Sequence, residues 1–404
     1  MRSFFAILTV AALLCAVSLG VRAESLNATA VRILTESPNY KSQDFSLQAA
    51  QLDLATSSNL PDPELKGEYL VLPSDVDNRW TAELSWGVEW PGVYNARSNE
   101  AKSQLNVAQL ATTAKRLEQL YEIKLLLIDY VECSLKLKLL DTLNQNNDSI
   151  FHLAEQASRG GEMTVLDLNK VKLEYANIRS ARALLIDQQA QIITELSQTL
   201  GKDCSPMIED MDCDFPPADI PTQEQISAIC EAAPEILSVL AEAESARKAK
   251  SVAKMEALPS ISLGYKHAFE DGMHFNGATF GISLPIFSSR GKQKAVNASI
   301  AEAEFTAEAK AAEIEAELLE TRKRLVLLEQ QINEISPLIE NADYNSALLK
   351  AYKGGVLTLI EYISDRNYFT TAALELASLR ASAAKSQAAL EKYFGYPSEE
   401  NTVR

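Results

Sequence analysis

The sequence of 404 residues has few of the groups on which enzymes and nucleic-acid-binding proteins depend. Its three histidines, His152, His267 and His274, lie in different sequence contexts, without a partner at metal-ligand spacing. The sequence therefore predicts no zinc site and no histidine-based catalysis. It contains no GxxxxGK[ST] or GxGxxG loop, which excludes nucleotide binding by those routes. Lys and Arg number 38 against 55 Asp and Glu, and the net charge of −17 argues against nucleic acid as a partner. We expect no enzyme activity and no cofactor.

Long apolar runs are also scarce. One extends over residues 4–19, after Arg2 and before Val21-Arg22-Ala23. A positive residue, a short apolar stretch and small residues before a cleavage position are typical of a secretory signal peptide, which we assign to residues 1–23. No later stretch approaches the roughly 20 apolar residues of a spanning helix. If the exported chain enters a membrane, we expect a β-barrel, because only helices and closed barrels satisfy the backbone in lipid.

Proline and glycine mark a duplication of the sequence. Landmarks of the first half recur in the second at offsets of 196, 198, 194 and 194 residues: Pro38 and Pro234, Pro61 and Pro259, Pro91 and Pro285, Gly160 and Gly354. Each half reads helix, two strands, long helix, tip and helix. We assign residues 24–200 and 223–395 to two structural repeats, 201–222 to a loop between them and 396–404 to a C-terminal tail.

The helical stretches are unusually long. Residues 94–157 contain neither proline nor glycine and predict a helix of 64 residues, about 96 Å long. The matching stretch, residues 292–352, is interrupted by Pro337. Helices of this length need partners along their whole length, which predicts a coiled-coil-like assembly. Each stretch ends at a glycine pair, and Thr164 or Thr358 follows as an N-cap. Each half therefore predicts a helical hairpin with a tight tip.

Four segments alternate between apolar and polar side chains, at residues 64–71, 79–90, 261–270 and 276–286. One face of segment 79–90 is wholly apolar and carries all three tryptophans, Trp80, Trp86 and Trp90. A soluble antiparallel sheet with one packed face would show the same alternation. The tryptophans favour instead the aromatic girdle of a membrane barrel, because no other element offers an apolar surface to cover that face. Since the smallest barrels have about eight strands, four strands require an oligomer.

Cysteines are few, and four remain after the predicted signal peptide. Cys204 and Cys213 lie close together in a segment rich in proline and aspartate. In an oxidising compartment they predict a short disulfide, whose alternative is two unpaired thiols.

The duplicated plan and the two tips resemble the TolC-like outer membrane efflux protein family over nearly the whole mature length. The tips read Arg159-Gly160-Gly161-Glu162-Met163-Thr164-Val165-Leu166-Asp167 and Tyr352-Lys353-Gly354-Gly355-Val356-Leu357-Thr358-Leu359-Ile360-Glu361. The resemblance implies an α+β membrane protein of a Gram-negative bacterium, a homotrimer with one 12-stranded transmembrane β-barrel in the outer membrane, four strands per chain. A long α-helical coiled-coil tunnel would continue through the periplasm. A periplasmic adaptor protein and an inner-membrane efflux pump are the implied partners of a passive duct.

The resemblance also implies roles for the residues that match the tips. The adaptor-docking set is Arg159, Gly160, Gly161, Thr164, Lys353, Gly354, Gly355 and Thr358. Glu361 matches an acid that lines the closed tunnel mouth, and Asp167 is its counterpart in the first half. A second family acid falls at Ser364, beside Asp365. These positions also have structural interpretations, because any long helical pair needs a turn and acids favour the first turn of a helix.

Two other functions remain open. A type I protein-secretion duct would have the same barrel and tunnel, and the sequence does not tell drugs, metal ions and polypeptides apart as cargo. A periplasmic coiled-coil scaffold belongs to a different class, with the strands forming a small soluble domain. Tryptophans spread around a soluble core would favour the scaffold.

Overall fold

The computed structural model describes residues 25–71, 78–209, 211–215, 218–270, 272–285, 291–340 and 344–393, with no side chains described at 143–149 and 345. The predicted signal peptide and C-terminal tail lie outside these residues. Among the helices in the described ranges, none combines the length and the hydropathy needed to cross a bilayer.

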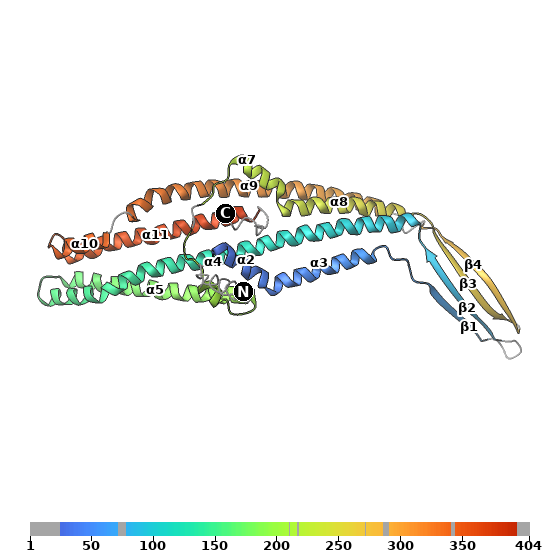
Figure 1. The fold of residues 1–404 in the computed structure, drawn as a ribbon, viewed down its shortest axis with the longest axis horizontal. Helices are drawn as coiled ribbons and strands as arrows, with labels where there is room; N and C mark the ends of the chain where they lie inside the picture. Colours follow the sequence, from blue (N-terminus) through green and yellow to red (C-terminus); the bar gives the residue numbers. More distant parts are fainter. Residues whose placement is uncertain are drawn as a thin grey trace, which may run out of the picture. The chain divides into compact units, whose positions relative to one another are not determined.

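Both halves have the same order of elements, except that α9 and α10 of the second half correspond to the single helix α4 of the first (Figure 1). In the first half this order is α2 (Leu26–Glu36), α3 (Pro38–Thr56), β1 (Glu64–Leu70), β2 (Arg79–Val88), α4 (Pro91–Arg159) and α5 (Val165–Leu200). Helix α6 (Ser205–Glu209) follows in the segment between the repeats. The second half contains α7 (Gln223–Ala232), α8 (Pro234–Met255), β3 (Ser260–Glu270), β4 (Met273–Ser283), α9 (Lys292–Glu340), α10 (Tyr344–Lys353) and α11 (Leu359–Glu391).

The long helices follow the sequence signals closely. Helix α4 has 69 residues, which corresponds to about 104 Å. Pro91 begins it, at a position where the missing N–H has no helical partner to lose. Helix α9 has 49 residues and contains Pro337 in its last turn. Because proline has no N–H, Pro337 removes one helical hydrogen bond close to the end of α9.

The chain divides into two compact units, each built from both halves. The tip unit comprises residues 1–40, 118–220 and 321–392, and the sheet unit comprises residues 41–117, 221–320 and 393–404. Each unit therefore depends on contacts between segments far apart in the sequence.

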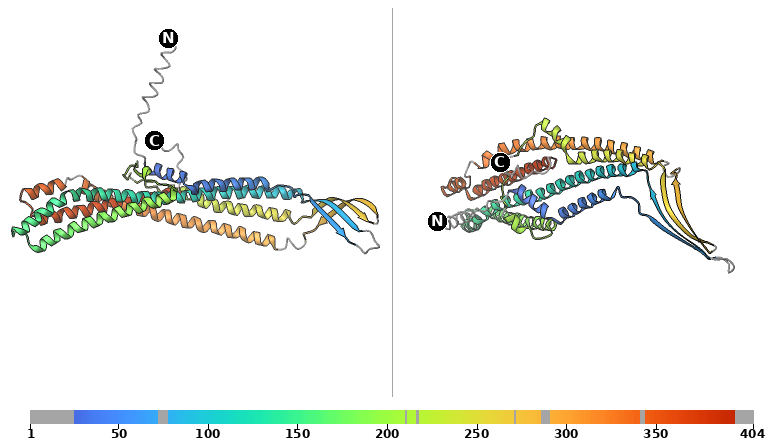
Figure 2. Two further views of the ribbon diagram at one scale, coloured as in Figure 1. Left: turned by 90° about the horizontal axis from the view of Figure 1, so that it is seen from below. Right: turned by 45° about the vertical axis from the view of Figure 1, so that its right-hand side comes forward.

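The sheet unit contains one antiparallel sheet in the order β1-β2-β3-β4, visible from two directions in Figure 2. Trp80 pairs with Tyr69 on β1 and with Phe269 on β3. Because directly paired residues share a face, the apolar face predicted for β2 continues onto its neighbours. Its members include Leu65, Tyr69, Trp80, Leu84, Trp86, Val88, Ile261, Leu263, Tyr265, Phe269, Phe280 and Ile282. Most of these side chains are exposed rather than packed on a core.

Ion pairs fix the start of α4 against β2 and α8. The Arg97 guanidinium donates to both carboxylate oxygens of Glu89, at 2.6 and 3.0 Å, and to Glu256 at 2.9 Å. The two carboxylates raise the pKa of Arg97 against the opposing effect of partial burial. Bidentate guanidinium–carboxylate contacts hold a fixed geometry, so the strand-to-helix junction is rigid at this point.

In the tip unit, α4 and α11 run antiparallel and are joined by charged side chains. Lys124 is buried, and its ammonium donates to Glu391 at 2.6 Å. Lys385 pairs with Asp129 at 2.5 Å, and Lys392 pairs with Glu118. The buried Lys124 contact matters most for stability, because exposed pairs contribute little.

Candidate functional site

The first candidate site is the tip between α4 and α5. Gly161 has φ +77°, a left-handed conformation that glycine adopts without steric cost. The N–H of Glu162 donates to the carbonyl of Ala157 at 2.9 Å, and the N–H of Gly161 donates to that of Ser158 at 3.2 Å. This pair of bonds is a Schellman motif, which satisfies carbonyls that the end of a helix leaves free. Arg159 is the last residue of α4, and its side chain is exposed.

The second tip repeats this geometry 194 residues later. Gly355 has φ +72°, and the N–H of Val356 donates to the carbonyl of Ala351 at 2.9 Å. The N–H of Gly355 donates to Tyr352 at 3.0 Å, which completes the second Schellman motif. Lys353 ends α10, and the next helix begins after Thr358. The two tips therefore share one backbone design.

Thr164 and Thr358 cap the helices that leave the tips. The Thr358 hydroxyl accepts from the N–H of Glu361 at 3.3 Å, while the Glu361 carboxylate accepts from the N–H of Thr358 at 2.8 Å. These reciprocal bonds form a capping box. The Thr164 hydroxyl accepts from the N–H of Asp167 at 3.1 Å and donates to its carboxylate at 2.8 Å. Asp167 makes no capping box in this way, since its side chain is one carbon shorter.

The acids predicted at the tunnel mouth thus have a structural role. The backbone N–H and hydroxyl of Thr358 lower the pKa of Glu361 by bonding to its charged form. The hydroxyl of Thr164 and the ammonium of Lys170 lower the pKa of Asp167 in the same manner. Asp365 lies exposed one turn after Glu361. Glu361 and Asp167 stand in the first turn of their helices, where the dipole favours negative charge, whereas Asp365 lies beyond the first turn of α11.

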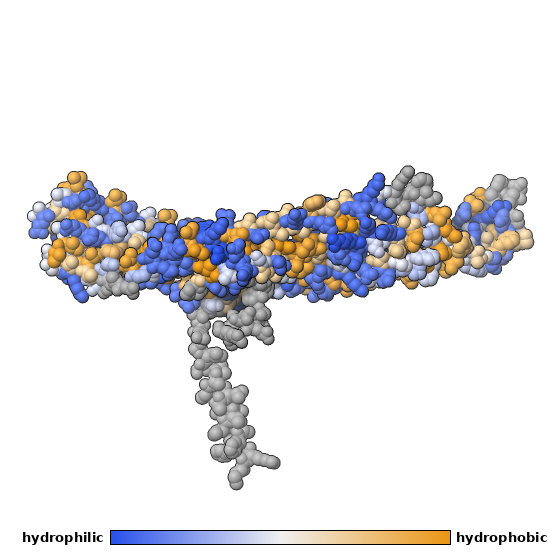
Figure 3. All heavy atoms as spheres, turned by 90° about the horizontal axis from the view of Figure 1, so that it is seen from above, coloured by the Kyte–Doolittle hydropathy of each residue, from blue (hydrophilic) through white to orange (hydrophobic). Residues whose placement is uncertain are grey.

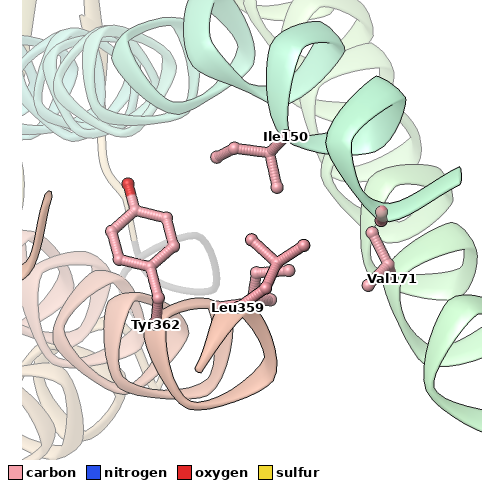
Figure 4. Packing of buried hydrophobic residues seen from close by; sticks show 6 residues of the cluster. Ile150, Val171, Leu359 and Tyr362 are labelled. Atoms are coloured by element: carbon pink, nitrogen blue, oxygen red, sulfur yellow. The ribbon is translucent and has the colours of Figure 1, made fainter. Parts of the chain in front are cut away.

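A buried apolar cluster packs the two hairpins together next to the tips. Ile150 of α4, Val171 of α5, and Leu359 and Tyr362 of α11 point toward one another (Figure 4). Ala154 and Ile363 complete the buried set. The cluster therefore links the first turn of α11 to the α4–α5 hairpin.

Arg366 lies beside this cluster and is 4% exposed. Its guanidinium carbon is 5.8 Å from the centroid of the Tyr362 ring, and both Glu174 and Tyr175 help to line the same small pocket. Burial lowers the pKa of Arg366, and the neighbouring Tyr362 and Glu174 oppose that shift. The sequence analysis missed this residue. The sequence nevertheless contained a signal for Arg366. Leu359, Tyr362 and Ile363 follow the spacing of one apolar helix face, and position 366 continues that face with a charged residue.

The polar face of the sheet is a second candidate surface. Glu83 pairs in register with Lys66 on one side and Lys266 on the other, and accepts from the Thr279 hydroxyl at 2.8 Å. On this face the strands approach closely at Gly264. A Cβ there would lie 2.6 Å from the Thr279 hydroxyl and 2.8 Å from the Leu84 carbonyl. Charged and hydroxyl side chains are thus concentrated on the face opposite the tryptophans.

The three tryptophans occupy different positions relative to the apolar face. Trp80 and Trp86 project from β2, and Trp90 lies just beyond the end of that strand and is half exposed. The indole N–H of Trp86 donates to the carbonyl of Pro61 at 2.7 Å, and the Trp80 ring lies 5.2 Å from that of His267. Both ends of the β2 segment therefore carry an indole, as an aromatic girdle would require.

Cys204 and Cys213 are both free thiols, so the predicted disulfide is not formed in this structure. Cys204 is fully buried against the end of α5. Its sulfur accepts from the Ser197 hydroxyl at 3.2 Å and donates to the carbonyl of Ile193 at 3.4 Å. The Cys213 thiol donates instead to Met211 at 3.8 Å. Each sulfur thus has its own local contacts. The closeness of the two cysteines in the sequence was not sufficient to predict a disulfide between them.

Solved outer membrane proteins have closely similar folds. The Campylobacter jejuni CmeC outer membrane channel is 17% identical, with a TM-score of 0.75 over 92% of this chain and 85% of that chain. The outer membrane protein VceC of Vibrio cholerae is 16% identical, with a TM-score of 0.72 over 92% and 96%. The open state of the Neisseria gonorrhoeae MtrE outer membrane channel is 12% identical, with a TM-score of 0.67 over 92% and 88%. The chain has the fold of the TolC-like outer membrane channels.

The TolC-like resemblance seen in the sequence is thereby confirmed for the fold. The neighbours are channels rather than enzymes. A scan against protein-family models finds no match, and a search of curated proteins finds none. At such low sequence identity, the comparisons support the TolC-like fold but not the roles of individual residues. The roles of the tips therefore rest on the geometry described above.

Proposed function

We propose that the chain is the passive outer-membrane exit duct of a tripartite efflux system in a Gram-negative bacterium. The observation that carries this proposal is the sheet. One of its faces is apolar and exposed, the other is polar and charged, and its order leaves β1 and β4 as unpaired edges. Such a sheet is unfavourable as a monomer in water. Three copies joined edge to edge would give a 12-stranded transmembrane barrel with the apolar face toward lipid and a polar lumen.

Exposed apolar side chains on the helices support a homotrimer. On the face drawn in Figure 3, apolar and polar patches alternate along the helices. Phe45 on α3 and Phe305 on α9 are 70% and 71% exposed, and Leu327 is 60% exposed. Long helices with apolar residues on an uncovered side require partners along their length. In the proposed trimer the neighbouring chains cover these side chains and enclose a periplasmic tunnel.

The tips are suited to docking a periplasmic adaptor protein, which would connect the duct to an inner-membrane pump. Val165, Leu166 and Val356 are 69%, 75% and 77% exposed, although they lie in or next to rigid Schellman turns. The exposed cations Arg159 and Lys353 flank them. A preorganised apolar surface with a charged rim is typical of a binding site. The shared geometry of the two tips would give two related docking points on each chain.

We assign Glu361, Asp167 and Asp365 to the tunnel mouth. A ring of carboxylates from three chains would bind cations and repel anions at its narrowest point. The capping bonds of Glu361 and Asp167 hold their side chains close to the helix starts. The proposed gate residues would therefore keep their positions unless the helix starts themselves rearrange.

The test is loss of export in cells that lack the gene. Deletion should raise the accumulation of fluorescent dyes or metal ions, and plasmid-borne wild type should restore export. Loss of secreted polypeptides without a change in accumulation would favour the type I secretion duct instead. No change in either, with the protein found soluble in the periplasm, would favour the coiled-coil scaffold and refute the duct.

A photo-crosslinking amino acid at Val356 tests the docking surface directly. We expect it to capture the adaptor, whereas the same amino acid at Phe305 should capture another copy of the chain. Adaptor capture from Phe305 but not from Val356 would contradict the assignment of the tips.

A further inference from the structure

Two of the three histidines meet on the apolar face of the sheet. His267 on β3 and His274 on β4 lie seven positions apart in the sequence, on opposite sides of the hairpin. The Nδ1 atom of His274 lies 3.3 Å from the Nε2 atom of His267. The ring centroids are 5.3 Å apart and the planes differ by 22°, so the two rings are stacked, and these two nitrogens are in close contact. The sequence shows no metal-ligand spacing for these histidines, and the register of the β3–β4 hairpin brings them into contact.

Neighbouring polar groups fix the protonation of His267. Its Nδ1 lies 2.6 Å from the Oδ1 of Asn276, which also accepts from the hydroxyl of Tyr265 at 2.7 Å. Because a carbonyl oxygen can only accept, Nδ1 of His267 carries the proton and Nε2 keeps its lone pair. A histidine whose second nitrogen donates to an oxygen acceptor is the usual arrangement of a metal ligand.

We propose that His267 and His274 bind a divalent transition-metal ion such as Zn²⁺, Ni²⁺ or Cu²⁺. Two nitrogens that each lie about 2.0–2.1 Å from a tetrahedral zinc ion are about 3.3 Å apart, which matches the distance in this pair. Imidazole suits these metals, whereas Mg²⁺ and Ca²⁺ prefer oxygen ligands. Small rotations of the two rings would turn both lone pairs onto one ion.

The surroundings define an open two-histidine site. Among the residues that the structure describes, no group of three or more His, Cys, Asp or Glu side chains could hold a metal. Water would therefore complete the coordination shell, because the pair lies beside the β3–β4 hairpin, near the Trp80–Phe269 pair at the end of the apolar face and not at its centre. The rings of Trp80 and Phe269 lie 5.2 Å from His267 and 5.0 Å from His274, respectively, and limit the space available to both imidazoles. A bound ion would cross-link β3 to β4 beside their hairpin, and this proposal does not depend on the export function.

The test uses the mature protein without a polyhistidine tag, purified in detergent and titrated with zinc chloride by calorimetry. Wild type should bind one zinc ion per chain. His267→Ala and His274→Ala should each weaken binding at least about tenfold, and Asn276→Ala should weaken it about 10- to 100-fold, as loss of an outer-shell partner does. His152→Ala is the matched control and should bind as wild type does, because it removes the remaining histidine of the chain.

A second measurement needs only wild type. Zinc should protect His267 and His274, but not the exposed His152, from modification by diethylpyrocarbonate as read by mass spectrometry. Zinc binding that persists in the double variant His267→Ala/His274→Ala would overturn the proposal. Unprotected histidines at zinc concentrations that saturate the calorimetric signal would also overturn it.

Discussion

The close approach of strands at Gly264 predicts how the sheet responds to one added methyl group. In Gly264→Ala the new Cβ would lie 2.6 Å from the hydroxyl of Thr279, 2.8 Å from the carbonyl of Leu84 and 3.1 Å from the Cα of Ser85. Rotating Thr279 relieves the first contact but disturbs its bond to Glu83. The other two contacts are with the backbone of β2, so β2 and β3 must separate. Overpacking of this kind costs about 1–3 kcal/mol, which is about 5- to 160-fold in an equilibrium constant.

Hydrogen exchange read by mass spectrometry on the detergent-solubilised protein measures this cost strand by strand. Amides of β2 and β3 should exchange faster in Gly264→Ala by a factor in that range, while α4 remains unchanged. Gly277→Ala is the matched control, because a Cβ at Gly277 on the same face meets nothing within 4 Å. Equal exchange in the two variants would refute the argument that the polar face is crowded at Gly264.

Three further predictions concern the helices. Thr358→Ala should speed amide exchange in the first turn of α11 about fivefold, because loss of an N-cap costs about 1 kcal/mol, and the exposed Thr371→Ala should not. The lowered pKa of Glu361 means that its contribution to the cap is complete above pH 4.5, its ordinary pKa, and is lost as the pH falls through the lower folded value. Exchange in this turn, corrected for intrinsic rates, should therefore rise on acidification in wild type but not in Glu361→Gln. Lys124→Ala should lower the melting temperature in detergent more than Lys124→Met does. Both variants remove the bond to Glu391, but only alanine leaves a cavity, which costs about 2–5 kcal/mol of stability.

Local signals in the sequence predicted the elements well. The helix predicted at residues 94–157 is observed as Pro91–Arg159, and the glycine pairs end helices with φ values of +77° and +72° at Gly161 and Gly355. Backbone chemistry is local, so breakers and caps can be read from a few neighbouring residues. The fourth strand begins at Met273, three residues before its predicted start at Asn276. Its ladder with β3 extends through the pair Glu270 and Met273, which the alternation pattern did not reveal.

Side-chain encounters across the fold were harder to predict. The contact of His267 with His274 depends on the register of the β3–β4 hairpin, and the burial of Arg366 depends on packing between two hairpins. The histidine contact has no sequence spacing that identifies it, whereas Arg366 continues the apolar helical spacing of Leu359, Tyr362 and Ile363, a signal that the sequence analysis did not use. The predicted Cys204–Cys213 disulfide was wrong for this structure because proximity along the chain does not set the direction of the thiols. The gate and docking roles of the tip residues stay predictions.

Fractionation of the mature protein from cells, followed by mass analysis in mild detergent, tests the central claim most directly. The proposed duct predicts recovery in the outer membrane as a particle with three copies of the chain. A soluble periplasmic monomer or dimer that is stable without detergent would contradict both the trimeric barrel and the export function built on it.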